Sequence, residues 1–224
     1  MPLSRFRQLS LLLAAALLAP WPSCAYDVEL SDTVVRNAYF LGQHRDQQTR
    51  AFFAPYIRHL PLPKSGPYIS ELRLLTPIAQ VVEVSQTTSG SYSAQQAQLD
   101  YRARGDSILL EIHIEFTPTY NQIDAQRSSS HAAGEKGITL RSDDFWQDFR
   151  FGIKQKQDWI EPRATHGEPQ YALANGYGAS GGLIGAWVWV EYDSRNVPSD
   201  DTEAHVFTPD GQDVSVTFDL DKLK

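Results

Sequence analysis

The chain has 224 residues, 42% of them hydrophobic, and a formal net charge of −7. This length suits one domain or two small ones, and it is sufficient to bury a hydrophobic core. The acidic charge and the lack of a Lys/Arg cluster argue against nucleic acid as a partner, because phosphate binding depends on clustered basic side chains.

The first 25 residues have the three parts of a secretory signal peptide. Arg5 and Arg7 precede an apolar stretch from Leu9 to Leu18, and two prolines then lead to the small residues Ser23-Cys24-Ala25. A membrane-spanning helix needs about 20 apolar residues, so this stretch is too short, and we expect no transmembrane segment in the mature chain. We predict export to the periplasm or the extracellular space, with cleavage after Ala25.

Two export products are considered, and they differ in whether the mature chain keeps Cys24. A cut after Ala25 removes the only cysteine, and the absence of disulfides fits a bacterial periplasm better than a eukaryotic secreted domain. The same cut removes two arginines and no acidic residue, so the net charge of −7 becomes −9. The alternative is a lipoprotein anchored through Cys24. Trp21 and Pro22 favour the first product, because lipid-attachment signals carry small or aliphatic residues there.

The N-terminal part of the exported chain, residues 26–105, is predicted to be mainly helical. Val34, Ala38 and Leu41 lie at i, i+4 and i+7, and Ser31 can cap the free amides at the start of that helix. A second helical pattern follows in the apolar residues Phe53, Tyr56, Ile57 and Leu60, with a kink or restart expected at Pro55.

Prolines around Lys64-Ser65-Gly66 predict a stiff connector, followed by a strand over Tyr68–Leu75. Thr76-Pro77 is typical of a helix start, because proline at the first helical position loses no hydrogen bond. The capping pattern at Ser93 and the terminating Gly105 predict one further helix.

From Ser107 the hydrophobic period changes to two, which predicts a half-buried strand over Leu110–Phe116. Residues 120–136 are polar and predict a long loop. Later strands are expected at 138–141, 149–153, 183–192, 204–207 and 214–218, the last two joined by a Thr208–Gly211 turn. We therefore predict an α+β fold: a helical portion, 26–105, followed by an antiparallel β-sandwich or sheet, 106–224.

Glu111, His113 and Glu115 alternate on the predicted strand, so their side chains share one face and could hold a divalent metal. Glu203 and His205 form a similar pair, and all five would converge if the two strands were neighbours. The favoured interpretation is a solvent-facing sheet surface with a core on its other side. No H-E-x-x-H, C-x-x-C or calcium-loop spacing is present.

Trp187 and Trp189 share one face of another predicted strand and could form a stacking platform for sugars or a protein. Val188, Val190 and Tyr192 make the other face apolar too. A strand that is apolar on both faces is usually central, so packing of the tryptophans in the core is the favoured alternative.

Gly178–Gly182 matches the G-x-S-x-G string of serine hydrolases, but the Val- and Trp-rich run after it predicts a strand where a nucleophile elbow needs a helix. The pairs Asp143-Asp144 and Asp200-Asp201 are typical of caps and turns. We therefore favour a non-enzymatic module that binds a protein or a polysaccharide, with no cofactor. A metal-dependent enzyme and a carbohydrate-binding module are the alternatives.

Overall fold

A computed structural model describes residues 26–88, 90, 92–120, 142–172 and 182–224. The fold is α+β, as predicted, with the longer helices in the N-terminal part and two antiparallel sheets. The α-helices are α2 (Asp32–His44), α3 (Gln47–Phe53), α4 (Pro77–Thr87) and α5 (Ala94–Arg104). The short 3-10 helices are η1 (Ala54–Tyr56), η2 (Phe145–Asp148), η3 (Ser194–Asn196) and η4 (Leu220–Lys222). Within the described part of the chain, no helix is long and apolar enough to cross a membrane.

The first sheet has five strands in the order β1-β2-β3-β7-β6, and every neighbouring pair is antiparallel. Its strands are β1 (Ile57–His59), β2 (Pro67–Leu75), β3 (Ser107–Phe116), β6 (Ala164–Tyr171) and β7 (Leu183–Asp193). β2 comes from the helical N-terminal part, yet it pairs with β3 along nearly its whole length. The helix-rich and strand-rich parts therefore share one sheet.

The second sheet has four strands in the order β5-β4-β8-β9, again antiparallel. Its strands are β4 (Arg150–Gln155), β5 (Asp158–Ile160), β8 (Asp201–Phe207) and β9 (Asp213–Asp219). β8 and β9 form the predicted hairpin, and the amide of Gly211 donates to the carbonyl of Thr208 at 2.9 Å. Gly211 has a φ of 86°, a conformation that favours glycine.

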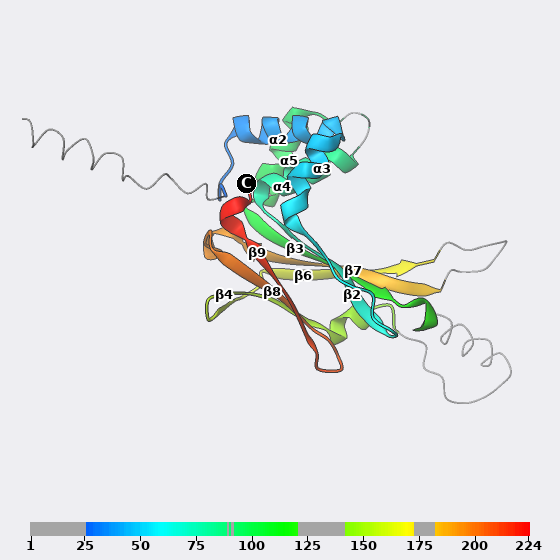
Figure 1. The fold of residues 1–224 in the computed structure, drawn as a ribbon. Helices are drawn as coiled ribbons and strands as arrows, with labels where there is room; N and C mark the ends of the chain where they lie inside the picture. Colours follow the sequence, from blue (N-terminus) through cyan, green and yellow to red (C-terminus); the bar gives the residue numbers. More distant parts are fainter. Residues whose placement is uncertain (1–25, 89, 91, 121–141, 173–181) are drawn as a thin grey trace, which may run out of the picture.

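The two sheets pack face to face around one hydrophobic core (Figure 1). Alternation along β3 directs Ile108, Leu110, Ile112 and Ile114 into that core, where all four are fully buried. The helices lie over one end of the five-stranded sheet (Figure 1), and Glu83 of α4 bonds to Arg73 on the surface opposite the core. We call this surface of the sheet the outer face.

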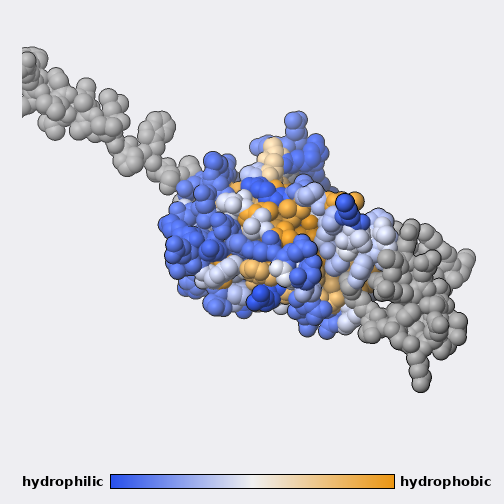
Figure 2. Space-filling model, turned by 60° about the horizontal axis from the view of Figure 1, so that its bottom comes forward, coloured by the Kyte–Doolittle hydropathy of each residue, from blue (hydrophilic) through white to orange (hydrophobic). Residues whose placement is uncertain are grey.

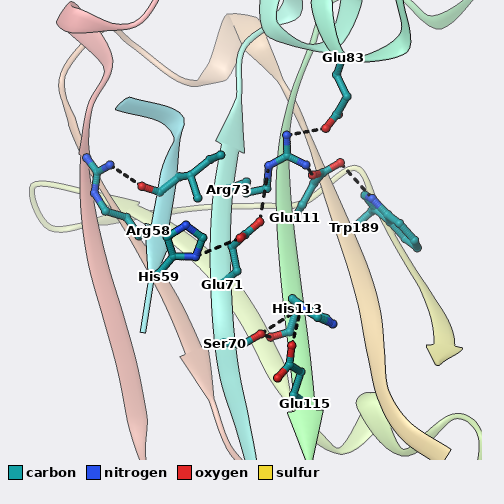
Figure 3. Close-up of polar contacts among 11 residues, drawn as sticks. Arg58, His59, Ser70, Glu71, Arg73, Glu83, Glu111, His113, Glu115 and Trp189 are labelled. Atoms are coloured by element: carbon teal, nitrogen blue, oxygen red, sulfur yellow. Dashed lines mark hydrogen bonds and ion pairs between the residues drawn. The ribbon is translucent and has the colours of Figure 1, made fainter. Parts of the chain in front are cut away.

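The helical layer is held together by a close contact between α2 and α4. A Cβ atom at Gly42 of α2 would lie 2.3 Å from the carbonyl oxygen of Val82, so only glycine allows the two backbones to approach this closely. α4 begins at Thr76-Pro77, as the sequence predicts, and it places Glu83 above the outer face (Figure 3).

The prediction of a helix through Ile57 and Leu60 is wrong. α3 ends at Phe53, the turn that contains Pro55 follows, and β1 begins at Ile57. Pro55 cannot donate the amide that a continuing helix needs, and Ile57 instead pairs with Arg73 of β2. Pairing across the sheet outweighs the helical spacing of the apolar residues.

β5 and β6 were not predicted, because neither has an alternating apolar pattern. β6 has the sequence ATHGEPQY and is an edge strand that owes its extended form to pairing with β7. The predicted strand at 138–141, the loop at 120–136 except for its first residue, and the signal peptide lie outside the described residues.

Candidate binding face on the five-stranded sheet

The structure brings the predicted metal triad and the predicted tryptophan pair together on the outer face. Cross-strand register aligns Glu111 with Trp189 and His113 with Trp187, because β3 and β7 are neighbours. β6 continues the same rows with His166 opposite Trp189 and Glu168 opposite Trp187. The face therefore combines aromatic rings with carboxylates in adjacent rows.

Arg73 is the centre of the polar cluster at the helix-covered end of this face (Figure 3). Its guanidinium lies 2.7 Å from the Glu111 carboxylate and 2.5 Å from that of Glu83 on α4. Arg73 Nε has no hydrogen-bond partner within the described residues and lies 3.8 Å from Glu71 Oε1. Arg73 thus contacts three carboxylates, and the one on α4, Glu83, links the sheet to the helical layer.

Glu111 is the most enclosed of these carboxylates, with 7% of its side chain exposed. Trp189 Nε1 donates to Oε1 at 3.1 Å, and Arg73 donates to Oε2. Burial raises the pKa of Glu111 to about 7, and the negative charge of Glu83 adds to this effect, while Arg73 and the Trp189 hydrogen bond oppose it. The interpretation of Glu111 as solvent-facing is therefore wrong.

His113 is the centre of a second polar group on the same face. Its Nε2 atom lies 2.7 Å from Gln170 Oε1 of β6, and its Nδ1 atom lies 3.0 Å from Ser70 Oγ and 3.2 Å from Glu115 Oε1. The imidazole also stacks on Trp187, with parallel planes and ring centroids 4.1 Å apart. Hydrogen bonds and stacking thus fix the orientation of His113.

Trp187 and Trp189 are half-buried on the outer face and do not belong to the hydrophobic core. Their ring centroids are 6.5 Å apart, and His166 stacks against Trp189 at 5.8 Å. Val188 on the other face of β7 is fully buried in the core. The core position that the sequence favours for the two tryptophans is therefore wrong, because only one face of β7 is covered by the second sheet.

His205 does not join this group, because β8 belongs to the four-stranded sheet. There its Nδ1 atom lies 3.0 Å from Asp213 and its Nε2 atom lies 3.3 Å from Glu203. The edge of the exposed Trp159 ring covers it, at a centroid distance of 4.9 Å. β3 and β8 are not neighbours, so the five proposed ligands do not converge. Within the described residues, no three His, Cys, Asp or Glu side chains are arranged to hold a metal ion.

The other sequence candidates lie away from this face or outside the described residues. Ser180 of the G-x-S-x-G string is outside them. Asp200 forms an exposed ion pair with Lys156 at 2.7 Å, and Asp144 accepts a hydrogen bond from Ser142. The Ser142–Asp144 contact is local, as expected of a cap or turn, whereas the Asp200–Lys156 pair joins residues 44 positions apart in the chain.

Sequence reasoning missed several side chains that complete the outer face, namely Ser70, Glu71, Arg73, Glu83, His166 and Gln170. Period-two alternation on the predicted 68–75 strand contains the signal for Glu71 and Arg73. No comparable signal exists for β6. Comparison of the chain with protein-family models, with curated proteins and with solved structures finds no match.

Proposed function

We propose that this chain is an exported, non-enzymatic binding module and that a polysaccharide binds to its outer face at Trp187. The observation that carries the proposal is the position of Trp187, half-buried on a polar sheet face instead of in the core. His113 stacks on this ring, and Gln170 of β6, which bonds to His113, has an amide group that can donate and accept hydrogen bonds.

A sugar ring matches this combination, because it has an apolar face of C–H groups and a rim of hydroxyls that both donate and accept hydrogen bonds. His113 already covers one face of Trp187, which fixes the indole before a ligand arrives. A ring that is held in place loses little conformational entropy on binding. The ligand contacts the part of the indole that His113 leaves uncovered.

A binding role suits Glu111 better than a catalytic one. Both of its oxygens are engaged, one by Arg73 and one by Trp189, so neither is presented to a substrate. Its raised pKa has a structural cause in burial and in the nearby Glu83 carboxylate. We therefore assign the Arg73 cluster to the attachment of the helices and the Trp187 group to ligand binding.

Export is the part of the proposal that rests on the first 25 residues alone. Mass spectrometry of the mature N-terminus distinguishes a chain that begins at Tyr26 from one that begins at a lipid-modified Cys24.

Native gel electrophoresis in gels that contain soluble xylan, β-glucan, dextran or alginate tests the ligand class. We expect at least one polymer to retard the wild-type protein and Trp187→Ala to weaken that binding about ten-fold or more, because a central aromatic contact dominates such interfaces. Trp159→Ala is the matched control, since Trp159 is 51% exposed on the other sheet. Unretarded migration in every gel, or an equal loss in Trp159→Ala, would contradict the proposal. A protein partner would then be the alternative.

A further inference from the structure

A pocket of about 530 Å³ opens between the two sheets, beside the β8–β9 turn. Three separate segments line it: part of the proline-containing connector and the start of β2 (60–69), η2 and the residue after it (145–149), and the β8–β9 turn with the start of β9 (208–214). On the side of the molecule towards which this turn points in Figure 1, hydrophobic residues gather in the middle, bordered by hydrophilic ones (Figure 2). The volume lies within the range of small-molecule pockets, about 300–1,000 Å³.

The walls of the pocket are held in place without a ligand. Its lining includes Pro61, Pro63 and Pro67, whose rings restrict the backbone and which have no amide proton to satisfy. The amide of Gly66 donates to Thr117 Oγ1 at 3.0 Å, and the amide of Thr117 donates to the carbonyl of Gly66 at 3.1 Å. These two bonds fix the connector to the end of β3, so the pocket is pre-organised.

The apolar part of the lining consists of aliphatic and aromatic side chains. Leu60, Ile69 and Val214 contribute aliphatic surface, and Phe149 contributes a ring. Such a surface favours an alkyl chain, and each methylene that it removes from water tightens binding about four-fold.

The charged groups in the lining all have one sign. The pocket is lined by the carboxylates Asp148 and Asp210 and by no Lys, Arg or His among the described residues. Asp210 accepts a hydrogen bond from the Thr208 hydroxyl and another from Gln212 Nε2 at 2.7 Å, and these bonds lower its pKa. Asp148 is exposed and has no hydrogen bond or ion pair within the described residues.

We propose that this pocket binds a cationic amphiphile, with the alkyl chain between the sheets and the ammonium group beside Asp148. The carboxylates of Asp148 and Asp210 favour a cationic head group, because they would repel an anionic head group on an alkyl chain of equal length. The site is separate from the polysaccharide face proposed above, and neither proposal depends on the other.

Isothermal titration calorimetry below the micelle concentration tests the proposal on the whole protein. We expect decyltrimethylammonium to bind saturably with one site per chain and at least ten-fold more tightly than decyl sulfate. Dodecyltrimethylammonium should bind about 15-fold more tightly than the decyl compound, because it buries two more methylenes. Saturable binding of neither amphiphile, or equal or tighter binding of decyl sulfate, would overturn the proposal.

Two variants locate the bound amphiphile. Val214→Trp fills the pocket and should abolish binding, with circular dichroism to verify the fold. Asp148→Asn, a surface change that leaves the core intact, should weaken binding of the ammonium compound about two- to five-fold and leave binding of uncharged decyl maltoside unchanged. Asp158→Asn is the matched control, because Asp158 is an exposed carboxylate outside the pocket. Unchanged binding in a folded Val214→Trp, or an equal effect of Asp158→Asn, would place the amphiphile elsewhere.

Discussion

The two sheets each carry a Glu-x-His sequence on one strand, and the two copies have different surroundings. Glu111 and His113 lie on β3, whereas Glu203 and His205 lie on β8. Glu111 is enclosed beneath α4 and bonded to Arg73, while half of the Glu203 side chain is exposed. The histidines also differ, since His113 stacks on an indole and His205 lies between two carboxylates.

This difference shows that strand alternation decides which side chains share a face, while the neighbouring elements decide their chemistry. β3 is central in its sheet, and Arg73 joins Glu111 to Glu83 of α4 (Figure 3). On β8, the Trp159 ring lies against His205. The same short sequence therefore places a buried carboxylate in an ionic cluster in one sheet and a half-exposed carboxylate beside a buried histidine in the other.

Of the substitutions considered, those at Arg73 and Arg150 should show the largest difference in stability loss between the two sheets. Arg73→Met removes the cation shared by Glu71, Glu83 and Glu111, and we expect a loss of about 3 kcal/mol in the free energy of unfolding. Arg150→Met on the four-stranded sheet should cost about 1 kcal/mol or less, because Arg150 is exposed above Phe207. Urea unfolding at pH 7.5 measures both.

A third variant verifies the cause of the Arg73 effect. If the loss comes from an uncompensated charge, Arg73→Met combined with Glu111→Leu should recover part of it. Equal losses in Arg73→Met and Arg150→Met would show that the two faces do not differ in this way.

The pH dependence of stability should distinguish Glu111 from Glu203. The folded-state pKa of Glu111 is about 7, above its usual value of 4.5, so the folded protein binds more protons than the unfolded chain between these pH values. The free energy of unfolding should therefore fall by about 2–4 kcal/mol as the pH rises from 4.5 to 7, and change little above that from this group. Glu111→Gln should flatten this slope, as unfolding curves at several pH values would show. If Glu203→Gln flattened the pH dependence of the free energy of unfolding as much as Glu111→Gln does, the assignment of this dependence to Glu111 would be contradicted.

Alanine substitutions at one glycine in each sheet should show a smaller difference in stability loss. A Cβ atom at Gly185 of β7 would lie 2.2 Å from the backbone oxygen of Ile114, whereas one at Gly152 of β4 would lie 3.1 Å from the Trp159 ring. A backbone strand cannot move aside, so Gly185→Ala should cost about 1–3 kcal/mol. Gly152→Ala should cost less than about 1 kcal/mol and alter Trp159 fluorescence. Thermal unfolding with tryptophan emission records both results, and the reverse order would be inconsistent with these contacts.

The sequence predicts the parts of this fold that have a clear periodicity. Alternation over 107–116 locates β3, and the Thr76-Pro77 start locates α4, because local sterics and hydrogen bonding decide both features. β6 was not predicted, since its polar sequence becomes a strand only through pairing with β7. β1 was predicted as helix for the same reason, because its pairing with β2 is not visible in local sequence.

The candidate binding face likewise has features that the sequence predicts and features that it does not. Period-two alternation alone places Glu111, His113 and Glu115 on one side of a strand and the two tryptophans on one side of another. Only the tertiary structure decides that β3 and β7 are neighbours, that α4 brings Glu83 to Arg73, and that His205 lies in the other sheet. These outcomes depend on contacts between residues far apart in the chain. Such contacts determine which side chains are shielded from water and which charges lie beside them.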